Sequence, residues 1–183
     1  MKGVCFRYCL IQNTMKHTYS ISGARLSLAP LEEENIQTVR IWRNRDDIRM
    51  CFVSRDIISE EQQLNWYKAY LKKPDDYVFQ IIENSTQKVI GMCSLYNISH
   101  KDMSAEFGRL MIGSSDARGK GYGSEAVRLA LDIGFQQLKL TEIHLEVLRN
   151  NSAALNTYLK CGFSPCSSRT TDVGEMIDMT IHK

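Results

Sequence analysis

Residues 117–123 read Ala-Arg-Gly-Lys-Gly-Tyr-Gly and lie between a predicted strand and a predicted helix. Glycines at alternate positions allow a backbone to turn sharply and to approach a ligand, because no Cβ stands in the way. Backbone N–H groups at the start of a helix attract anions, and the side chains of Arg118 and Lys120 add positive charge. The run therefore predicts an anion-binding turn. Its spacing is neither that of a P-loop nor that of a dinucleotide-binding turn, which argues against both folds.

The elements on both sides of this turn predict an α/β fold. Before the turn, polar segments separate three strand-like runs at residues 77–83, 88–96 and 105–112. After it come a helix at 121–138, a strand at 143–148, a helix at 152–161 and a strand at 176–181. The first three runs predict an antiparallel meander, and a helix between two strands predicts a parallel crossover. We therefore expect a mixed, mostly antiparallel sheet with helices on both faces.

The first part of the chain predicts one strand and two helices. Leucines alternate with polar residues over 25–28, which indicates a strand. A helix over 31–43 carries acidic residues in its first turn, where they favour the helix dipole. A second helix over 60–71 is preceded by a capping box formed by Ser59 and Gln62.

Composition and charge limit the function classes. The chain has 183 residues, of which 43% are apolar and 24% charged, as is typical of one globular domain. We interpret residues 25–183 as that domain and residues 1–24, which have no clear period, as an N-terminal appendage. The net charge of +2 gives no electrostatic reason to expect nucleic acid or a membrane as a partner.

Cysteine usage and the lack of long apolar runs favour a cytoplasmic protein without a metal. The six cysteines include no CxxC pair, and no histidine stands at zinc-ligand spacing beside them. Thiols in a reducing cytosol are therefore the expected state. No apolar run approaches the length of about 18 residues that a membrane-spanning helix needs.

The glycine-rich turn is the first of two spaced motifs. The pair reads Arg118-x-x-Gly121-x-Gly123 and, after the next strand, Asn151-x-x-Ala154-x-x-x-Tyr158-x-x-x-Gly162-Phe163. In this order, each with its expected strand and helix, the motifs resemble the GNAT family of N-acetyltransferases. The resemblance covers residues 25–183 and is strongest over 106–163. It implies acetyl-CoA as the acetyl donor and the GNAT fold, a seven-stranded sheet with a V-shaped splay between its fourth and fifth strands.

The resemblance also implies which residues bind acetyl-CoA. The backbone of the turn would hold the pyrophosphate, and the splayed strands would leave a gap for the pantetheine arm. An exposed strand edge has unpaired backbone groups, which the amides of pantetheine can satisfy. The implied cofactor residues are Leu110, Met111, Ile112, Arg118, Gly119, Lys120, Gly121, Tyr122, Gly123, Asn151, Ala154 and Tyr158.

The implied reaction is direct attack of a neutral amine on the thioester. The reference pKa of tyrosine is about 10, so Tyr158 would stay protonated at neutral pH and could give a proton to the leaving thiolate. A strand N–H between Leu110 and Ile112 would stabilise the oxyanion. The proton of the amine would go to Glu146, to Glu106 or to a water relay. Tyr158 could instead be a core aromatic, and either glutamate a solvated strand residue.

The N-terminal half would select the acceptor amine. Trp42 and Trp66 can stack on a base or a sugar, and Arg43 can bind a phosphate. With the downstream segments 144–147 and 150–151, this arrangement resembles the amino-sugar N-acetyltransferases of the pseudaminic acid pathway. Those enzymes acetylate the 4-amino group of a UDP-linked dideoxy sugar. We therefore expect a nucleotide-linked amino sugar as the acceptor.

That resemblance implies a set of acceptor-binding residues. They are Trp42, Arg43, Met50, Phe52, Trp66, Glu106 and Glu146. The sequence departs from the pattern at Gln63, where a histidine would fit, and at Glu106, where an aromatic would, so the identity of the sugar stays open. Trp42 could instead be a core residue, and Arg43 a helix C-terminal charge.

Looser resemblances leave other acceptors open. The chain is also similar to ribosomal-protein N-terminal and spermidine acetyltransferases, so a protein N-terminus or a polyamine is an alternative. A polyamine site should present many carboxylates, whereas Arg40, Arg43, Arg45 and Arg49 favour an anionic acceptor. A non-enzymatic alternative is an acyl-CoA-binding module, against which the presence of Tyr158 argues. Family resemblance implies a monomer or a homodimer through the C-terminal strands.

Overall fold

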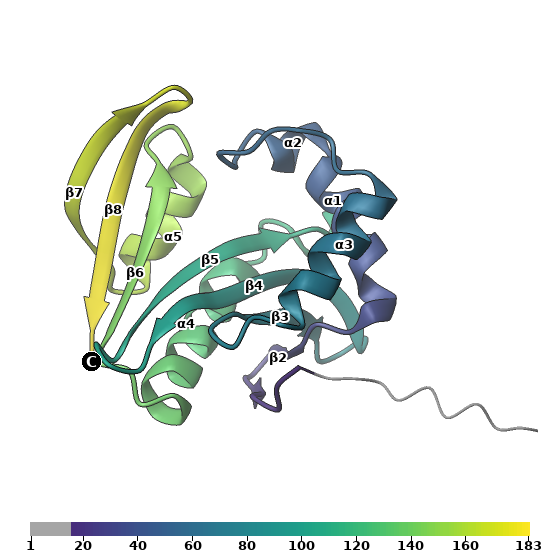
Figure 1. Ribbon diagram of the computed structural model, residues 1–183, viewed down its shortest axis with the longest axis horizontal. Coiled ribbons are helices and arrows are strands. Elements are labelled where there is room, and N and C mark those ends of the chain that lie inside the picture. Colours follow the sequence, from purple (N-terminus) through teal and green to yellow (C-terminus); the bar gives the residue numbers. More distant parts are fainter. Residues whose placement is uncertain (1–15) are drawn as a thin grey trace, which may run out of the picture.

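The computed structural model describes residues 16–183 (Figure 1). Within this range eight strands form one sheet in the order β1-β2-β3-β4-β5-β6-β8-β7. Neighbouring strands are antiparallel except β5 and β6, which are parallel. The strands are β1 (Ile21–Ser22), β2 (Leu26–Pro30), β3 (Tyr77–Glu83), β4 (Lys88–Ser99), β5 (Ser104–Ile112), β6 (Glu142–Leu148), β7 (Ser164–Thr171) and β8 (Gly174–His182).

The α-helices are α1 (Ile36–Asn44), α2 (Asp46–Arg49), α3 (Glu60–Tyr70), α4 (Tyr122–Asp132) and α5 (Ser152–Lys160). Short 3-10 turns, η1 (Glu33–Asn35) and η2 (Ser115–Ala117), precede α1 and α4, and a π-helical turn, η3 (Ile133–Gln137), extends α4. The predicted capping box of α3 is confirmed, because Ser59 Oγ accepts from Gln62 N at 3.1 Å and Ser59 N donates to Gln62 Oε1 at 2.7 Å.

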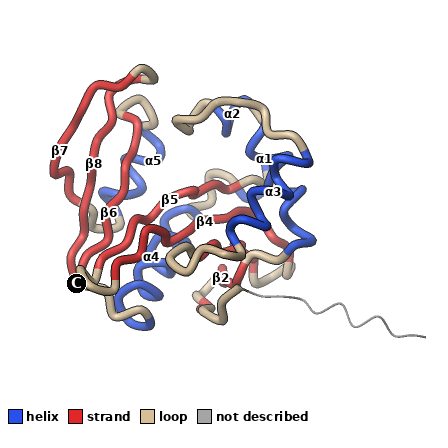
Figure 2. The backbone as a smooth tube through the Cα atoms, viewed as in Figure 1, coloured by secondary structure: helices blue, strands red, loops and turns tan. Residues whose placement is uncertain are grey.

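The sheet carries a hydrophobic core on each face. Neighbouring side chains of β3 point to opposite faces: Phe79 belongs to the core that contains Val127 of α4. Val78 belongs to the other core, with Val39 of α1 and Tyr67 of α3. Helix α4 therefore covers one face, and α1 and α3 cover the other (Figures 1 and 2). This arrangement confirms the predicted mixed sheet with helices on both faces.

Strands β5 and β6 separate after a short stretch of pairing. Their parallel ladder joins Ser104 to Glu142, Ala105 to Ile143 and Glu106 to His144. Farther along β5, Arg109 has a φ of 53°, in the left-handed region, and the pairing with β4 shifts register beside it. An irregularity of this kind bends its strand. β5 and β6 therefore diverge (Figure 1), which confirms the predicted V-shaped splay.

The expected N-terminal appendage does not hold for residues 16–24. Lys16 Nζ donates to the carbonyl oxygens of Tyr70 and Asp76 at 2.8 and 2.6 Å, and His17 is buried. Residues 21–22 pair with β2 as the strand that brings the sheet to eight instead of the expected seven. Such a short strand has too few residues to show a period. Residues 1–15, the rest of the expected appendage, lie outside the described residues.

Two further elements are not predicted by the residue pattern. β7 is an edge strand of mostly exposed polar residues and contains Pro165, so it lacks the apolar alternation that indicates a strand. α2 has four residues, of which Ile48 is buried, and is therefore too short to show a helical period. Both elements border the candidate site.

Candidate active site

The glycine-rich turn borders a groove of about 460 Å³, here called the turn groove. Of the predicted cofactor residues, the groove is lined by Leu110, Met111, Ile112, Arg118, Gly119, Gly121, Tyr122, Gly123, Asn151 and Ala154. Gly121 precedes α4 with a φ of 77°, and a Cβ added to Gly119 would meet nothing within 4 Å. The N–H groups of the first turn of α4 have no carbonyl four residues back to bind. The groove therefore fits the predicted pyrophosphate.

The two basic residues of the turn lie on different sides of it. Arg118 lines the groove, and its Nε donates to Ile112 O at 3.1 Å. Lys120 lies in a separate depression beside Trp42. The chain changes direction at Gly119, where φ is 72°. The prediction that Lys120 lines the cofactor groove is therefore not supported by its position.

A second cavity of about 280 Å³, here called the strand gap, lies where β5 and β6 diverge. Three predicted catalytic residues line it together: Glu106 from β5, Glu146 from β6 and Tyr158 from α5. The strand gap shares Leu110 and Asn151, among others, with the turn groove. The two cavities therefore adjoin, and a molecule with one end at the turn can reach the three side chains.

Tyr158 is buried at the inner end of the strand gap. Its ring packs edge to face against Phe107 and Phe163, with centroids 6.1 and 5.9 Å apart. Burial raises the pKa of Tyr158 above its ordinary value. Its phenol therefore stays protonated at neutral pH and can act as a proton donor. The packing also supports the alternative, since Tyr158 is part of the core.

The two glutamates of the gap have different partners. Glu106 accepts hydrogen bonds from Tyr96 Oη and, at 3.0 Å, from Asn97 Nδ2. Glu146 forms an ion pair with Arg169 Nη2 at 2.6 Å. Burial, together with the hydrogen bond to Glu106, raises the pKa of Tyr96. Glu106 is thus held by neutral donors, whereas one oxygen of Glu146 is paired with a cation that partly balances its charge.

Asn151 supports α5 as well as lining the two cavities. Its Oδ1 accepts from Ala154 N at 3.2 Å, which caps the N-terminus of the helix. The carboxamide nitrogen of Asn151 takes no part in this capping hydrogen bond. The side chain can therefore fix the start of α5 and still donate toward the cavities.

Arg109 is a site residue that the sequence analysis missed. It lines the strand gap and also a third cavity described below. Its guanidinium donates to both carboxylate oxygens of the buried Asp76, at 2.6 and 3.0 Å, and its Cζ lies 4.4 Å from the ring centroid of Tyr96. Its left-handed φ is uncommon for a residue with a side chain. A charged residue within an apolar strand was the available signal.

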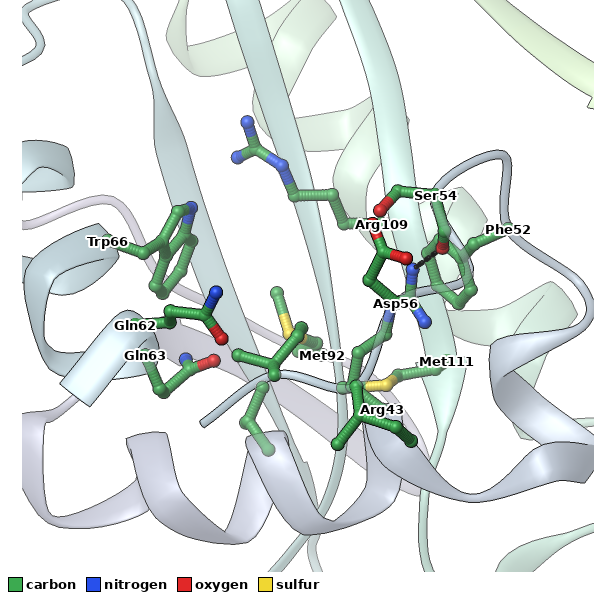
Figure 3. Close-up of a pocket in the computed structure, with 13 residues that line it drawn as sticks. Arg43, Phe52, Ser54, Asp56, Gln62, Gln63, Trp66, Met92, Arg109 and Met111 are labelled. Atoms are coloured by element: carbon green, nitrogen blue, oxygen red, sulfur yellow. Dashed lines mark hydrogen bonds between the residues drawn. The ribbon is translucent and has the colours of Figure 1, made fainter. Parts of the chain in front are cut away.

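The third cavity, of about 520 Å³, is here called the α3 cavity (Figure 3). It is lined from α1 by Arg43, from α3 by Gln62, Gln63 and Trp66, from the segment after α2 by Phe52, Ser54 and Asp56, and from the sheet by Met92, Arg109 and Met111. Three of the seven expected acceptor residues, Arg43, Phe52 and Trp66, thus come together here. Trp66 stacks on Tyr70, with ring centroids 5.7 Å apart.

Arg43 is held without a carboxylate. Its Cζ lies 3.9 Å from the ring centroid of Phe52, and its Nη2 donates to Ser54 O. Its Nη1 is buried without a hydrogen-bond partner, and the ion pairs found among residues 16–183 do not include it. Burial, and then the charge of Arg49, lower the pKa of Arg43. The Nη1 group of Arg43 can therefore donate a hydrogen bond to an anion or a carbonyl oxygen.

Two expected acceptor residues lie elsewhere. The indole of Trp42 covers Gly113, where an added Cβ would lie 2.0 Å from Trp42 Cδ2. Trp42 precedes Arg43 by one residue, which is about 100° around α1, and so faces another direction. Met50 is 49% exposed and lines none of the three cavities. Trp42 and Met50 therefore do not share a cavity with Arg43, Phe52 and Trp66, because neighbouring residues of a helix or turn face different ways.

The described residues contain neither a metal site nor a helix that could span a membrane. Among residues 16–183, no group of three His, Cys, Asp or Glu side chains is arranged to hold a metal ion. Within the same residues, none of the helices has both the length and the apolar character needed to cross a membrane.

Comparisons with known proteins agree with this geometry. The family model described as acetyltransferase (GNAT) domain matches residues 25–164. The spermidine N(1)-acetyltransferase of Escherichia coli K12 is 31% identical over 152 residues, 78% of this chain and 75% of that protein. The corresponding enzyme of Vibrio cholerae is 26% identical over 141 residues, 77% of this chain and 80% of that protein. Among solved structures, the Vibrio cholerae enzyme with CoA and spermine has a TM-score of 0.81 at 23% identity, over 87% of this chain and 96% of that one.

Proposed function

The chain belongs to the GNAT acetyltransferase family, and on this basis we propose that the amine it acetylates is a polyamine. Family membership makes the protein an N-acetyltransferase that takes its acetyl group from acetyl-CoA. The acceptor and the roles of individual side chains are the proposal. The observation that carries it is the 31% identity with a spermidine N(1)-acetyltransferase over 78% of this chain.

The strand gap supports a cationic acceptor. Glu106 and Glu146 line it from two diverging strands. Of the two arginines that also line it, Arg109 is paired with Asp76, whereas Arg43 has no carboxylate partner among residues 16–183. Opposite charges a few ångströms apart attract by about 1 kcal/mol in water and more near a protein surface. The carboxylates of Glu106 and Glu146 can therefore pair with an ammonium group in the gap, next to Tyr158.

The proposed reaction uses the three side chains that line the strand gap. Glu106 or Glu146 accepts the proton that the ammonium group loses, so that the neutral nitrogen bonds to the thioester carbonyl carbon. Tyr158 gives its proton to the sulfur as the carbon–sulfur bond breaks. The nitrogen loses its second proton to solvent as the amide forms, and solvent reprotonates Tyr158. Backbone N–H groups of residues 110–112 would stabilise the negative oxygen. The resulting products are an N-acetylated amine and a free thiol.

We infer that the α3 cavity holds the rest of the acceptor. It adjoins the strand gap, because Arg43 and Arg109 line both. The indole of Trp66 offers an apolar wall for a methylene chain, and Asp56 offers a carboxylate for a second ammonium group. Asp76 neutralises the charge of Arg109. These features accommodate an extended polyamine beyond its reacting end.

The nucleotide-linked amino sugar favoured by the sequence analysis is not supported by these relatives, which favour the polyamine instead. Two of its expected contacts, Trp42 and Met50, also lie outside the α3 cavity. One observation keeps an acidic acceptor as a second candidate. The guanidinium of Arg43 has no carboxylate partner among the described residues, and it could pair with an acidic group of the acceptor.

A panel of amines tests the acceptor. Thiol release from acetyl-CoA is measured with spermidine, spermine, a UDP-linked 4-amino-dideoxy sugar, a peptide with a free N-terminus and an aminoglycoside. We expect turnover with spermidine and spermine. Turnover confined to the sugar, the peptide or the aminoglycoside, or turnover of none of these amines, would contradict the polyamine proposal.

Two variants test whether the carboxylate in the strand gap binds the acceptor, or whether the loss of any carboxylate on β6 has the same effect. Glu146→Gln removes a carboxylate from the strand gap and should raise the KM for spermidine several-fold. Glu142→Gln makes the same change on β6 at the end where β5 and β6 still pair, and should leave that KM unchanged. Equal effects of both variants would count against a role for Glu146 in acceptor binding.

A further inference from the structure

The turn groove contains a carboxylate that the reaction does not use. Among the residues that line the groove within 16–183, Asp47 is the only acidic one. Its carboxylate forms an ion pair with Arg118 and also accepts from Arg45 Nη2 at 2.7 Å. The hydrogen bonds of these two arginines lower the pKa of Asp47, so the carboxylate is charged at neutral pH.

Both arginines are fixed to the end of β5. Arg118 Nε donates to Ile112 O at 3.1 Å, beside the predicted pyrophosphate position. Arg45 Nη1 donates to Gly113 O at 2.7 Å. The ion pairs therefore connect α2, which carries Asp47, to the strand end from which the glycine-rich turn departs.

Asp47 belongs to the segment 46–56, which forms one wall of the α3 cavity. Phe52 and Asp56 of this segment line that cavity. Ile48 is the one buried residue of the segment. With so little buried apolar surface, the position of the segment depends on its polar contacts. The ion pair with Arg118 is one of these contacts.

Asp47 and a phosphate group compete for the same cation. The side chains of Arg118 and Asp47 are 35% and 46% exposed, so a ligand in the groove can reach the pair. An exposed ion pair of this kind is weak, because water screens the two charges. A phosphate forms charge-assisted hydrogen bonds with arginine and repels a carboxylate. Arrival of a pyrophosphate at the turn therefore weakens the attachment of segment 46–56.

We propose that Asp47 is a positioning residue that couples the turn groove to the α3 cavity. Without the donor, Asp47 holds segment 46–56 against Arg118. With the donor bound, the phosphates take Arg118, and Asp47 keeps only its contact with Arg45. The segment is thereby loosened, which changes the wall of the acceptor cavity. The coupling is reciprocal, so that contacts favouring the attached segment also weaken donor binding.

Calorimetric titration with CoA, in the absence of any acceptor, tests the competition. Asp47→Asn should bind CoA about threefold to fivefold more tightly than the wild type, because the competing charge is gone. Asp46→Asn is the matched control: it makes the same change on α2, but Asp46 pairs with Arg49 and does not line the groove. Its CoA affinity should equal that of the wild type.

Titration with pantetheine, which has no phosphate, separates competition from a general structural effect. We expect the affinities of the wild type and Asp47→Asn for pantetheine to be equal. A gain or loss of affinity that is the same for pantetheine and CoA would overturn the proposal. So would equal CoA affinities of the Asp47→Asn and wild-type proteins.

Hydrogen exchange tests the loosening of the segment. In the wild type, addition of CoA should speed the exchange of residues 46–56. In free Asp47→Asn, exchange should already be fast, and CoA should not change it further. A wild-type segment whose exchange is unaffected by bound CoA would contradict the coupling. Neither measurement depends on the acceptor, so a failed polyamine assignment leaves this test intact.

Discussion

The turn groove and the α3 cavity are built in different ways. About half of the residues that line the groove lie within 110–124, which include the glycines of the turn, and the rest come from α5 with its N-cap and from the segment 47–52. The α3 cavity combines side chains from α1, α3, the segment after α2, β4 and β5. Its charged groups depend on distant partners, as Arg109 does on Asp76.

This difference explains why the donor is easier to assign than the acceptor. A site made of backbone groups requires particular φ values and small residues. Both requirements place glycines at fixed positions, which can be recognised in the sequence. A site made of side chains requires that several segments pack together, and similar packing can present different charges. Substitutions should also affect the α3 cavity and the strand gap in different ways. Loss of a charge should damage the α3 cavity most, and loss of a reactive group should damage the strand gap.

The largest effect is expected from Asp76→Asn, which should lower the free energy of unfolding because it removes the ion-pair partner of Arg109. Asp76 is 3% exposed, and removing one partner of a buried ion pair costs about 3 kcal/mol. Chemical denaturation should show this loss. The less buried neighbour provides the control, since Asp75→Asn should cost much less. Similar losses for both variants would show that the ion pair does not anchor the α3 cavity.

The second effect concerns His17, which packs against Tyr77 and Phe79 on the strand that leads from Asp76. Burial lowers the pKa of His17 from 6.5 to about 4. The unfolded chain therefore takes up a proton at higher pH than the folded one. The stability from this residue is complete above 6.5 and is lost as pH falls toward 4.

Between about pH 7 and about pH 5 this loss should amount to about 2 kcal/mol. Denaturation curves of the wild type and of His17→Phe at both pH values measure it, and the variant should lose less stability than the wild type. Equal pH dependence of the two proteins would contradict a buried, neutral His17.

The third effect concerns the reactive group of the strand gap. Tyr158→Phe should lower turnover at least about tenfold, because it removes a proton donor but little volume. Titration of the variant with CoA should give nearly the wild-type affinity, since the turn groove keeps its backbone. Equal turnover of variant and wild type would refute the role of Tyr158 as general acid.

The smallest effect distinguishes the two tryptophans. Trp66→Phe should raise the KM of the acceptor about fivefold, because aromatic contacts contribute roughly 1 kcal/mol. Trp42→Phe should leave that KM unchanged and should lower the midpoint of thermal unfolding, since Trp42 packs on Gly113. If the two variants changed the KM equally, the α3 cavity would not be the acceptor site.

The sequence by itself determined the elements whose signals are local. The glycine spacing predicted the turn, Ser59 and Gln62 predicted the start of α3, and strand-like runs separated by polar segments predicted β3 to β5. The motif of α5 predicted a tyrosine next to the donor groove, and Tyr158 lies at the adjoining strand gap. These features depend on interactions among residues a few positions apart, so the residue order records them.

Only the tertiary structure decided which side chains meet. Trp42 and Arg43 are adjacent in sequence, but one covers Gly113 and the other lines the α3 cavity. The ion pairs of Arg118 with Asp47 and of Arg109 with Asp76 join segments that no local pattern connects. Such contacts depend on how β5 bends and on where α2 packs. Those positions result from the sum of many weak interactions over the whole fold and not from any one short segment.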